Sequence, residues 1–279
     1  MSERFVVKNN TNDSKATRLP IRQEFAQGRF NRDALAHVSR YLWIMERIER
    51  LADDLQRPVS ILDIGCGDAY IMRVLNRTSK RQNDSLVSYY TGVDIDERRV
   101  TATREELSRW QTPTNFVVED LTVTGLAGWD QHDVVICLEV LEHIQPHYVA
   151  PTLKRFAEIA AHRAFISTPN WPGGSGRLPK DHIKEWDHEA ELVPAMLDAG
   201  LCVIDSVGTF CQLSHAKRLA KAGATVHLSG HDIPFAPLYE EFRRAMDKDF
   251  ASLALARLMG TKSQNLLYEC STPSSASVS

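Results

Sequence analysis

The feature that most constrains the fold of this chain is a short apolar strand that runs into a glycine loop and then into a helix. It is the run SILDIGCGDAY at residues 60–70. Its first half is apolar and β-prone, and the residues that follow it have helical spacing. Gly65 and Gly67 let the backbone turn sharply and approach a ligand. Because this order presents free backbone N–H groups at the start of a helix, we expect a nucleotide-like cofactor site here.

The rest of the chain alternates between apolar runs and helix-like segments. The further apolar runs are residues 90–95, 116–118, 134–138, 164–167, 201–207 and 265–270. The helix-like segments are residues 33–55, 69–78, 97–110 and 147–162. This alternation predicts an α/β fold with a Rossmann-like, seven-stranded, mostly parallel sheet that carries helices on both faces.

Composition shifts along the chain suggest its division into segments. Polar residues dominate the first stretch and serines the last, and neither can bury enough apolar surface to order itself. Residues 209–260 are helix-rich without a sheet pattern of their own, which is typical of a lid or substrate lobe. We expect a disordered arm (1–20), a helical segment (21–58), a cofactor-binding core (59–208), a helical insertion (209–260), the last strand (261–270) and a disordered tail (271–279).

The charge balance and the cysteines limit which partners and which cellular compartment we expect. The 279 residues carry 33 basic and 36 acidic side chains, for a formal charge of -3. This balance gives no indication of a nucleic-acid partner. It is still compatible with a local basic groove. Five cysteines without CxxC spacing favour a reduced compartment, and no run approaches the ~20 apolar residues of a membrane span. We expect a soluble, cytoplasmic protein without a membrane partner.

Acidic residues follow the predicted strands, where ligands of open α/β sheets bind. Asp63 lies beside the glycine loop, Asp94 ends the second apolar run, Asp120 follows the third, and Glu139 begins an acid-histidine segment after the fourth. A carboxylate suits a vicinal diol because it accepts protons from both hydroxyls. Tyr70 stands where a dinucleotide fingerprint needs its third glycine, which counts against NAD.

The motifs LDIGCGDA, TGVDID, NFVVEDL and DVVICLEVLEHI, in this order, resemble the class I S-adenosylmethionine-dependent methyltransferases over residues 59–208. A cationic ammonium and sulfonium tolerate the neighbouring acids Asp63 and Asp68, which a pyrophosphate would not. The resemblance implies a contact for each part of the cofactor. The backbone of Gly65, Cys66 and Gly67 and the Asp63 carboxylate would hold the methionine end, Asp94 the ribose, and Asp120, Ile95 and Leu121 the adenine, with Glu139 as a further cofactor contact.

Glu139, Glu142 and His143 are the candidate catalytic residues. In one helical turn they would share a face that points toward the transferred methyl group. His143 could act as a general base, or the three side chains could hold a hard divalent ion that binds substrate hydroxyls. A third interpretation is that Glu142 and His143 only brace the next helix.

A second resemblance extends this set. The acid-histidine segment, TPN at residues 168–170 and DHIKEW at residues 181–186 together resemble the small-RNA 3′-terminal ribose 2′-O-methyltransferases. That resemblance implies a magnesium ion held by Glu139, Glu142, His143 and His182. A histidine after the fifth strand is also similar to small-molecule O-methyltransferases, including those of the ubiquinone pathway, and His182 could simply bond to nearby backbone.

The function expected from the sequence is transfer of a methyl group from S-adenosylmethionine to an oxygen or nitrogen of an unidentified small molecule, nucleotide or nucleic acid. The alternatives are a metal-dependent RNA 3′-terminal ribose 2′-O-methyltransferase and a non-catalytic cofactor-binding or partner-binding module. Arg40 and Tyr41 in the N-terminal helix are candidates for substrate contact, although a solvated helix face explains the arginine equally well.

Overall fold

The structure is a computed structural model that describes residues 32–78, 86–171, 178–228 and 230–273. Within these residues, seven strands form one sheet in the order β3-β2-β1-β4-β5-β9-β6, and β7 and β8 form a separate pair. The strands of the sheet are β1 (Val59–Ile64), β2 (Val87–Asp94), β3 (Thr114–Val118), β4 (His132–Leu138), β5 (Ala160–Pro169), β6 (Cys202–Phe210) and β9 (Asn265–Ser271). The first five are parallel, and β9 runs antiparallel to both of its neighbours. The predicted fold class is confirmed.

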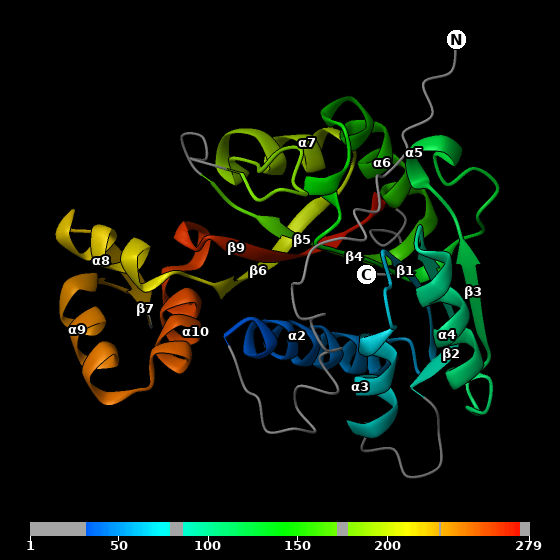
Figure 1. Ribbon diagram of the computed structural model, residues 1–279, viewed down its shortest axis with the longest axis horizontal. Helices are drawn as coiled ribbons and strands as arrows, with labels where there is room; N and C mark the ends of the chain where they lie inside the picture. The colour runs from blue at the N-terminus through cyan, green and yellow to red at the C-terminus, as the bar shows by residue number, and fades with distance from the viewer. Residues whose placement is uncertain (1–31, 79–85, 172–177, 229, 274–279) are drawn as a thin grey trace.

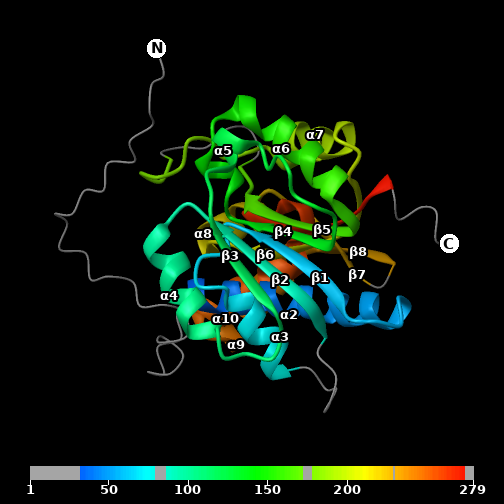
Figure 2. The same cartoon turned by 90° about the vertical axis from the view of Figure 1, so that its right-hand side faces the viewer.

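Two layers of helices bury the sheet (Figures 1 and 2). One face carries α2 (Arg32–Asp54), α3 (Tyr70–Thr78) and α4 (Glu97–Leu107), and the other carries α5 (Leu121–Thr124), α6 (Pro146–Ile159) and α7 (Val193–Asp198). Strands β1 and β4 are buried along nearly their whole length because both of their faces are covered. This explains why their sequences read as continuous apolar runs.

The strand order reverses between β1 and β4. From β1 the chain first moves outward to β2 and β3, and it then returns to place β4 on the other side of β1. In open parallel sheets this reversal opens a crevice at the carboxyl ends of the strands, which is where ligands bind. Two short turns lie between β4 and α7: a 3₁₀ turn η1 (Leu141–His143) after β4 and a π-helical turn η2 (His188–Leu192) before α7.

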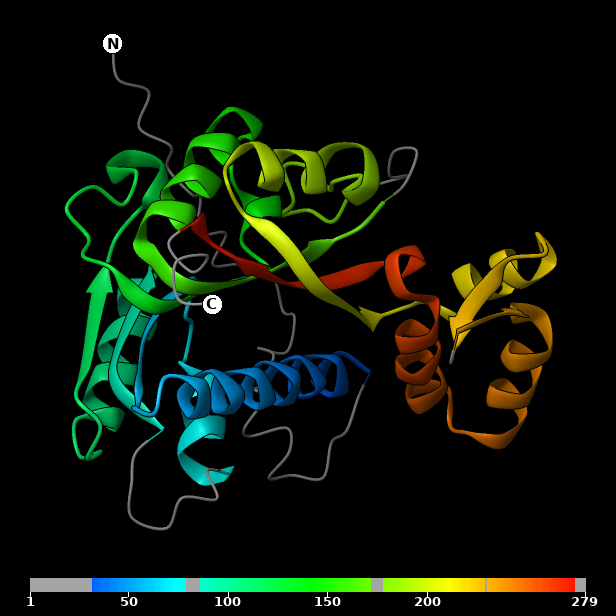
Figure 3. The same cartoon turned by 180° about the vertical axis from the view of Figure 1, so that it is seen from behind.

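Residues 209–260 form a lobe beside β6 with an apolar core of its own (Figure 3). The lobe contains α8 (Leu213–Lys221), α9 (Phe235–Ala245) and α10 (Lys248–Met259), and a 3₁₀ turn η3 (Gly260–Lys262) leads back to the sheet. The expectation that this insertion has no strands is wrong, because β7 (Thr225–Leu228) and β8 (His231–Pro234) pair as an antiparallel ladder. Each strand has only four residues, which is the lower limit for recognising an alternating pattern in a sequence.

Several expectations concern the ends of the chain. The predicted arm at residues 1–20 lies outside the described residues, and so do residues 274–279 of the predicted tail. In the described part of the chain, every helix is too short or too polar to cross a bilayer.

Candidate functional site

The glycine loop after β1 is tightly packed against the segment after β4. Gly65 and Gly67 have φ angles of 72° and 55°. A Cβ atom on Gly65 would lie 2.3 Å from Cγ2 of Val140, so only glycine fits there. Cys66, between the two glycines, is buried against the core. The loop backbone is therefore in close contact with the segment after β4, and binding of the methionine end by this loop stays a prediction.

Two aspartates flank the loop. The Asp94 carboxylate accepts hydrogen bonds from the backbone N–H groups of Gly67 (2.8 Å) and Asp96 (2.9 Å), which fixes its orientation. Asp63 is buried and accepts a hydrogen bond from the Tyr90 hydroxyl at 2.6 Å. Burial raises the pKa of Asp63 to about 7, and the charges of Asp94 and Asp68 act in the same direction although the Tyr90 hydrogen bond opposes them. A cationic ligand group would balance the charge of the Asp63 carboxylate, so this residue suits the ammonium end of S-adenosylmethionine.

The adenine side of the expected site is apolar and open. Ile95, next to Asp94, and Val118, at the end of β3, are exposed by 58% and 45%. Leu121 is partly buried against the core. Asp120 caps α5 through Oδ1, which accepts from the Thr122 backbone and hydroxyl groups. Exposed apolar side chains suit a flat aromatic ring, and contact of Ile95, Asp120 and Leu121 with the adenine stays a prediction.

Glu139 departs from the expected arrangement. The expectation that it shares the face of one helical turn with Glu142 and His143 is wrong, because Glu139 has a φ angle of 56° and precedes the 3₁₀ turn. Its carboxylate forms an ion pair with Arg40 at 2.9 Å and accepts hydrogen bonds from Ser167 (2.8 Å) and Asn265 (2.7 Å). Burial raises the pKa of Glu139, but Arg40 and Ser167 outweigh it, and the pKa lies below its usual value.

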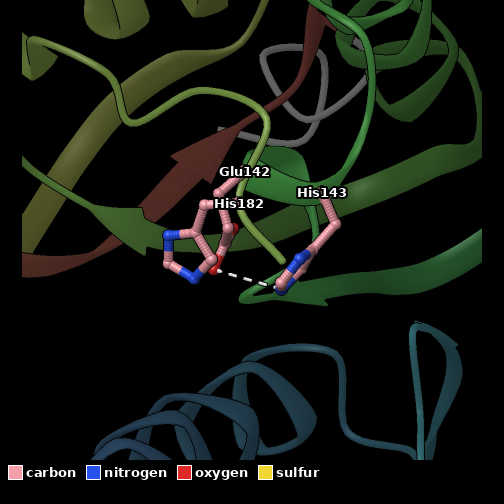
Figure 4. Close-up of side chains that lie close together, drawn as sticks. All are labelled: Glu142, His143 and His182. Atoms are coloured by element: carbon pink, nitrogen blue, oxygen red, sulfur yellow. Dashed lines mark ion pairs between the residues drawn. The ribbon is translucent and has the colours of Figure 1, made fainter. Parts of the chain in front are cut away.

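Glu142, His143 and His182 converge at the carboxyl edge of the sheet (Figure 4). One candidate ligand atom from each lies within 4.8 Å of the others. Glu142 is 1% exposed, and its Oε2 accepts a hydrogen bond from the Thr168 hydroxyl at 2.9 Å. Its Oε1 lies 3.9 Å from Nε2 of His143. Burial and the charge of Glu139 raise the pKa of Glu142 well above its usual range. Glu139, expected as a fourth ligand, is not part of this cluster.

Both histidines are held by their Nδ1 atoms. His143 Nδ1 donates to the Asp181 backbone carbonyl at 2.9 Å, and His182 Nδ1 donates to the Glu185 carboxylate at 2.8 Å. In neutral imidazoles these bonds leave each Nε2 with a lone pair, which is the arrangement that metal-bound histidines adopt. The backbone N–H of Ile183 also donates to the Glu142 carbonyl at 2.7 Å, which fastens the His182 segment to η1.

The side chains of Glu142, His143 and His182 could act chemically in two ways. Nε2 of His143, whose side chain is 37% exposed, can accept a proton from an acceptor group. The three clustered side chains can instead hold a divalent ion. The sequence reasoning missed the partners that set these geometries, namely Ser167, Asn265 and Glu185. The DHIKEW motif contains Glu185 three residues after His182, and this spacing was the available signal.

Comparisons with known proteins identify the family and the fold of this chain. Residues 35–227 match a family model described as a methyltransferase domain. A ubiquinone biosynthesis O-methyltransferase of Aeromonas salmonicida (strain A449) is 28% identical over 186 residues, which are 58% of this chain and 71% of that protein. A small RNA 2′-O-methyltransferase of Mus musculus is 25% identical over 175 residues, or 56% of this chain. The match spans only 39% of the mouse protein.

A solved structure shows the same fold. Magnesium protoporphyrin IX methyltransferase from Synechocystis PCC 6803, with S-adenosylmethionine bound, superimposes with a TM-score of 0.50 at 13% identity. The superposition covers 94% of this chain and 86% of that one. The family match spans well over half of the chain. The chain belongs to the methyltransferase domain family and is a class I S-adenosylmethionine-dependent methyltransferase.

Proposed function

We propose that this enzyme methylates a hydroxyl group and that a divalent ion held by Glu142, His143 and His182 binds the acceptor. The observation that carries the proposal is the convergence of these three side chains within 4.8 Å, with both histidines held by Nδ1. A bound ion would polarise the acceptor hydroxyl and lower its pKa. One carboxylate with two imidazoles favours a first-row transition ion such as Mn²⁺ over the Mg²⁺ expected from the sequence, since imidazole is a poor ligand for Mg²⁺.

Hydrogen bonds within the chain would hold the three ligands of this ion in their orientations. Thr168 fixes the Glu142 carboxylate, and the Asp181 carbonyl and Glu185 fix the two imidazoles. The chemistry is an in-line displacement at a sulfonium methyl group, so alignment of the acceptor oxygen with that methyl group is the main contribution of the protein.

The acceptor hydroxyl that best suits this site belongs to a vicinal diol, because two neighbouring oxygens chelate one ion. Support for an oxygen acceptor comes from the relatives, since the Aeromonas and mouse proteins are both named O-methyltransferases. The name of the mouse protein makes the ribose of a small RNA the first acceptor to test. RNA carries a vicinal diol at its 3′-terminal ribose. Catechol is a small-molecule diol for comparison.

The experiment measures transfer of labelled methyl groups to a short RNA, to the same RNA with a 2′-deoxy 3′ end, and to catechol. We expect transfer to a diol, loss of transfer in EDTA and recovery with Mn²⁺. His182→Ala should abolish Mn²⁺ binding but leave S-adenosylhomocysteine binding intact. Glu191→Gln is the matched control, because Glu191 pairs with Lys184 in the same segment but lies outside the cluster. Full activity in EDTA would reject the metal and leave His143 as a general base.

We also infer a cytoplasmic location. The five cysteines are unpaired and four of them are buried, as in proteins of reducing compartments.

A further inference from the structure

The first acid of the Glu-x-x-Glu-His segment, Glu139, already has a cation of its own. Arg40 of α2 is only 3% exposed, and its Nη1 lies 2.9 Å from Oε1 of Glu139 and 3.2 Å from the Ser167 hydroxyl. Arg40 is 99 residues before Glu139, so the sequence pattern gives no sign of the pair. A charge-assisted hydrogen bond between an arginine and a carboxylate is stronger than a neutral one, and removal of one partner leaves the other charge uncompensated.

The remaining lone pairs of Glu139 are also engaged. Oε1 accepts a second hydrogen bond, from Ser167, and Oε2 accepts one from Nδ2 of Asn265. The Asn265 side chain is itself oriented, because its Oδ1 accepts a hydrogen bond from the Thr209 hydroxyl at 2.7 Å. Four secondary structure elements, α2, β5, β6 and β9, thus hold one carboxylate in place. The left-handed backbone of Glu139 is a strained conformation that such a surrounding network can maintain.

The two glutamates of the segment are therefore in different electrostatic situations. Glu139 has a full ion pair, whereas Glu142 contacts the Thr168 hydroxyl, and among the described residues no lysine or arginine lies within ion-pair distance of it. The Arg40–Glu139 pair has no net formal charge, although Glu139 acts more strongly than Arg40 on Glu142. An incoming ion consequently meets the Glu142 carboxylate and the imidazoles of His143 and His182.

We propose that Arg40 determines the metal specificity of this site by keeping the Glu139 carboxylate out of it. This inference rests on the proposed function, since it needs an ion at Glu142, His143 and His182. With one carboxylate the site discriminates against Mg²⁺, which prefers oxygen ligands, and accepts Mn²⁺, which tolerates imidazole. Removal of Arg40 would take away the ion-pair partner of the Glu139 carboxylate, whose side chain is 25% exposed, and a bound ion would be an alternative counter-charge.

The test is calorimetry of the full chain, saturated with S-adenosylhomocysteine, with Mn²⁺ and Mg²⁺ in turn. The quantity of interest is the ratio of the Mg²⁺ dissociation constant to that of Mn²⁺. Arg40→Met keeps the length of the side chain without its charge, and we expect this ratio to fall at least tenfold. Arg40→Lys should keep the wild-type ratio. The double variant R40M/E139Q should return to the wild-type ratio, because the released carboxylate is absent.

A second variant makes the test independent of how well Arg40→Met folds. Glu139→Gln in the presence of Arg40 should change the Mn²⁺ dissociation constant less than twofold, since Glu139 is not a ligand. A tenfold weaker Mn²⁺ affinity of that variant, or an unchanged metal ratio in a folded Arg40→Met protein, would overturn the inference. Failure of the wild-type chain to bind either ion is a different result, which would remove the proposed metal site itself.

Discussion

At the scale of single residues, Asp63 couples cofactor binding to pH. The pKa of its buried carboxyl is about 7, and a neighbouring ammonium group would lower it. Cofactor binding below pH 7 therefore releases a proton, so affinity should rise with pH until about 7. We predict that S-adenosylhomocysteine binds roughly tenfold more weakly at pH 6 than at pH 8.

Calorimetry in two buffers of different ionisation enthalpy measures both the affinity and the released proton. Asp63→Asn should bind more weakly, and its affinity should not change between pH 6 and pH 8. Equal wild-type affinities at the two pH values would show that Asp63 does not face the ammonium group.

Glu185 is the second residue whose role is testable alone. It holds Nδ1 of His182 at 2.8 Å, and its side chain is only 3% exposed. Loss of such an orienting carboxylate typically weakens metal binding by about 10- to 100-fold. We predict this loss of Mn²⁺ affinity for Glu185→Leu, measured by calorimetry, with unchanged S-adenosylhomocysteine affinity. Glu191→Gln, a change to a more exposed acid of the same segment, should bind Mn²⁺ as the wild type does.

At the scale of elements, the glycine loop depends on its contact with the segment after β4. In Gly65→Ala the new methyl group would overlap Val140 at 2.3 Å, and the φ angle of 72° is itself unfavourable for alanine. We predict at least about tenfold weaker S-adenosylhomocysteine binding, because a shift of the loop costs more than ~1.4 kcal/mol.

The controls for this prediction separate crowding from backbone strain. Gly128 has a φ angle of 79°, and a Cβ atom at this position would meet nothing within 4 Å, so Gly128→Ala should reduce stability without affecting cofactor affinity. Adding Val140→Ala to Gly65→Ala should restore part of the affinity. No recovery in the double variant would mean that backbone strain, rather than Val140, limits the loop.

The elements differ in how far their sequences reveal them. The seven sheet strands and α2, α3, α4 and α6 were predictable because continuous burial and helical spacing leave plain patterns. The β7–β8 hairpin was not, because each of its strands has only four residues. The candidate cofactor residues could be proposed from their places after strands. The direction of the Glu139 side chain could not, because it depends on Arg40 and Asn265, which are 99 and 126 residues away in the sequence.

At the scale of the whole molecule, the candidate site draws on both ends of the chain. Arg40 enters from the first described helix and Asn265 from the last strand, and they meet at a carboxylate that follows β4. The antiparallel insertion of β9 between β5 and β6 makes this meeting geometrically possible. The chemistry of the site is thus tied to completion of the sheet.

His188 connects β5 and β9, and it should make the free energy of unfolding depend on pH. It is 1% exposed, its Nε2 lies 2.9 Å from the Pro169 carbonyl at the end of β5, and its Nδ1 lies 3.0 Å from the Tyr268 hydroxyl of β9. Burial lowers the pKa of His188 to about 4, against about 6.5 in an unfolded chain. Between these values the unfolded chain binds more protons, so stability is complete above pH 6.5 and falls as the pH drops toward 4.

The difference between the two pKa values corresponds to about 3 kcal/mol in the free energy of unfolding between pH 7.5 and pH 4. Buried carboxyls with raised pKa values, such as Asp63 and Glu142, act in the opposite direction, so the contribution of His188 must be taken as a difference between proteins. Urea unfolding at pH 7.5 and pH 4.5 should show a smaller acid-induced loss for His188→Gln than for the wild type, even though the variant is less stable at neutral pH. The exposed His147→Gln control should lose as much stability as the wild type. Equal losses in all three proteins would mean that other groups cause the acid sensitivity. A reduced loss confined to His188→Gln would identify this histidine as the group whose protonation weakens the contact between β5 and β9 beneath the candidate site.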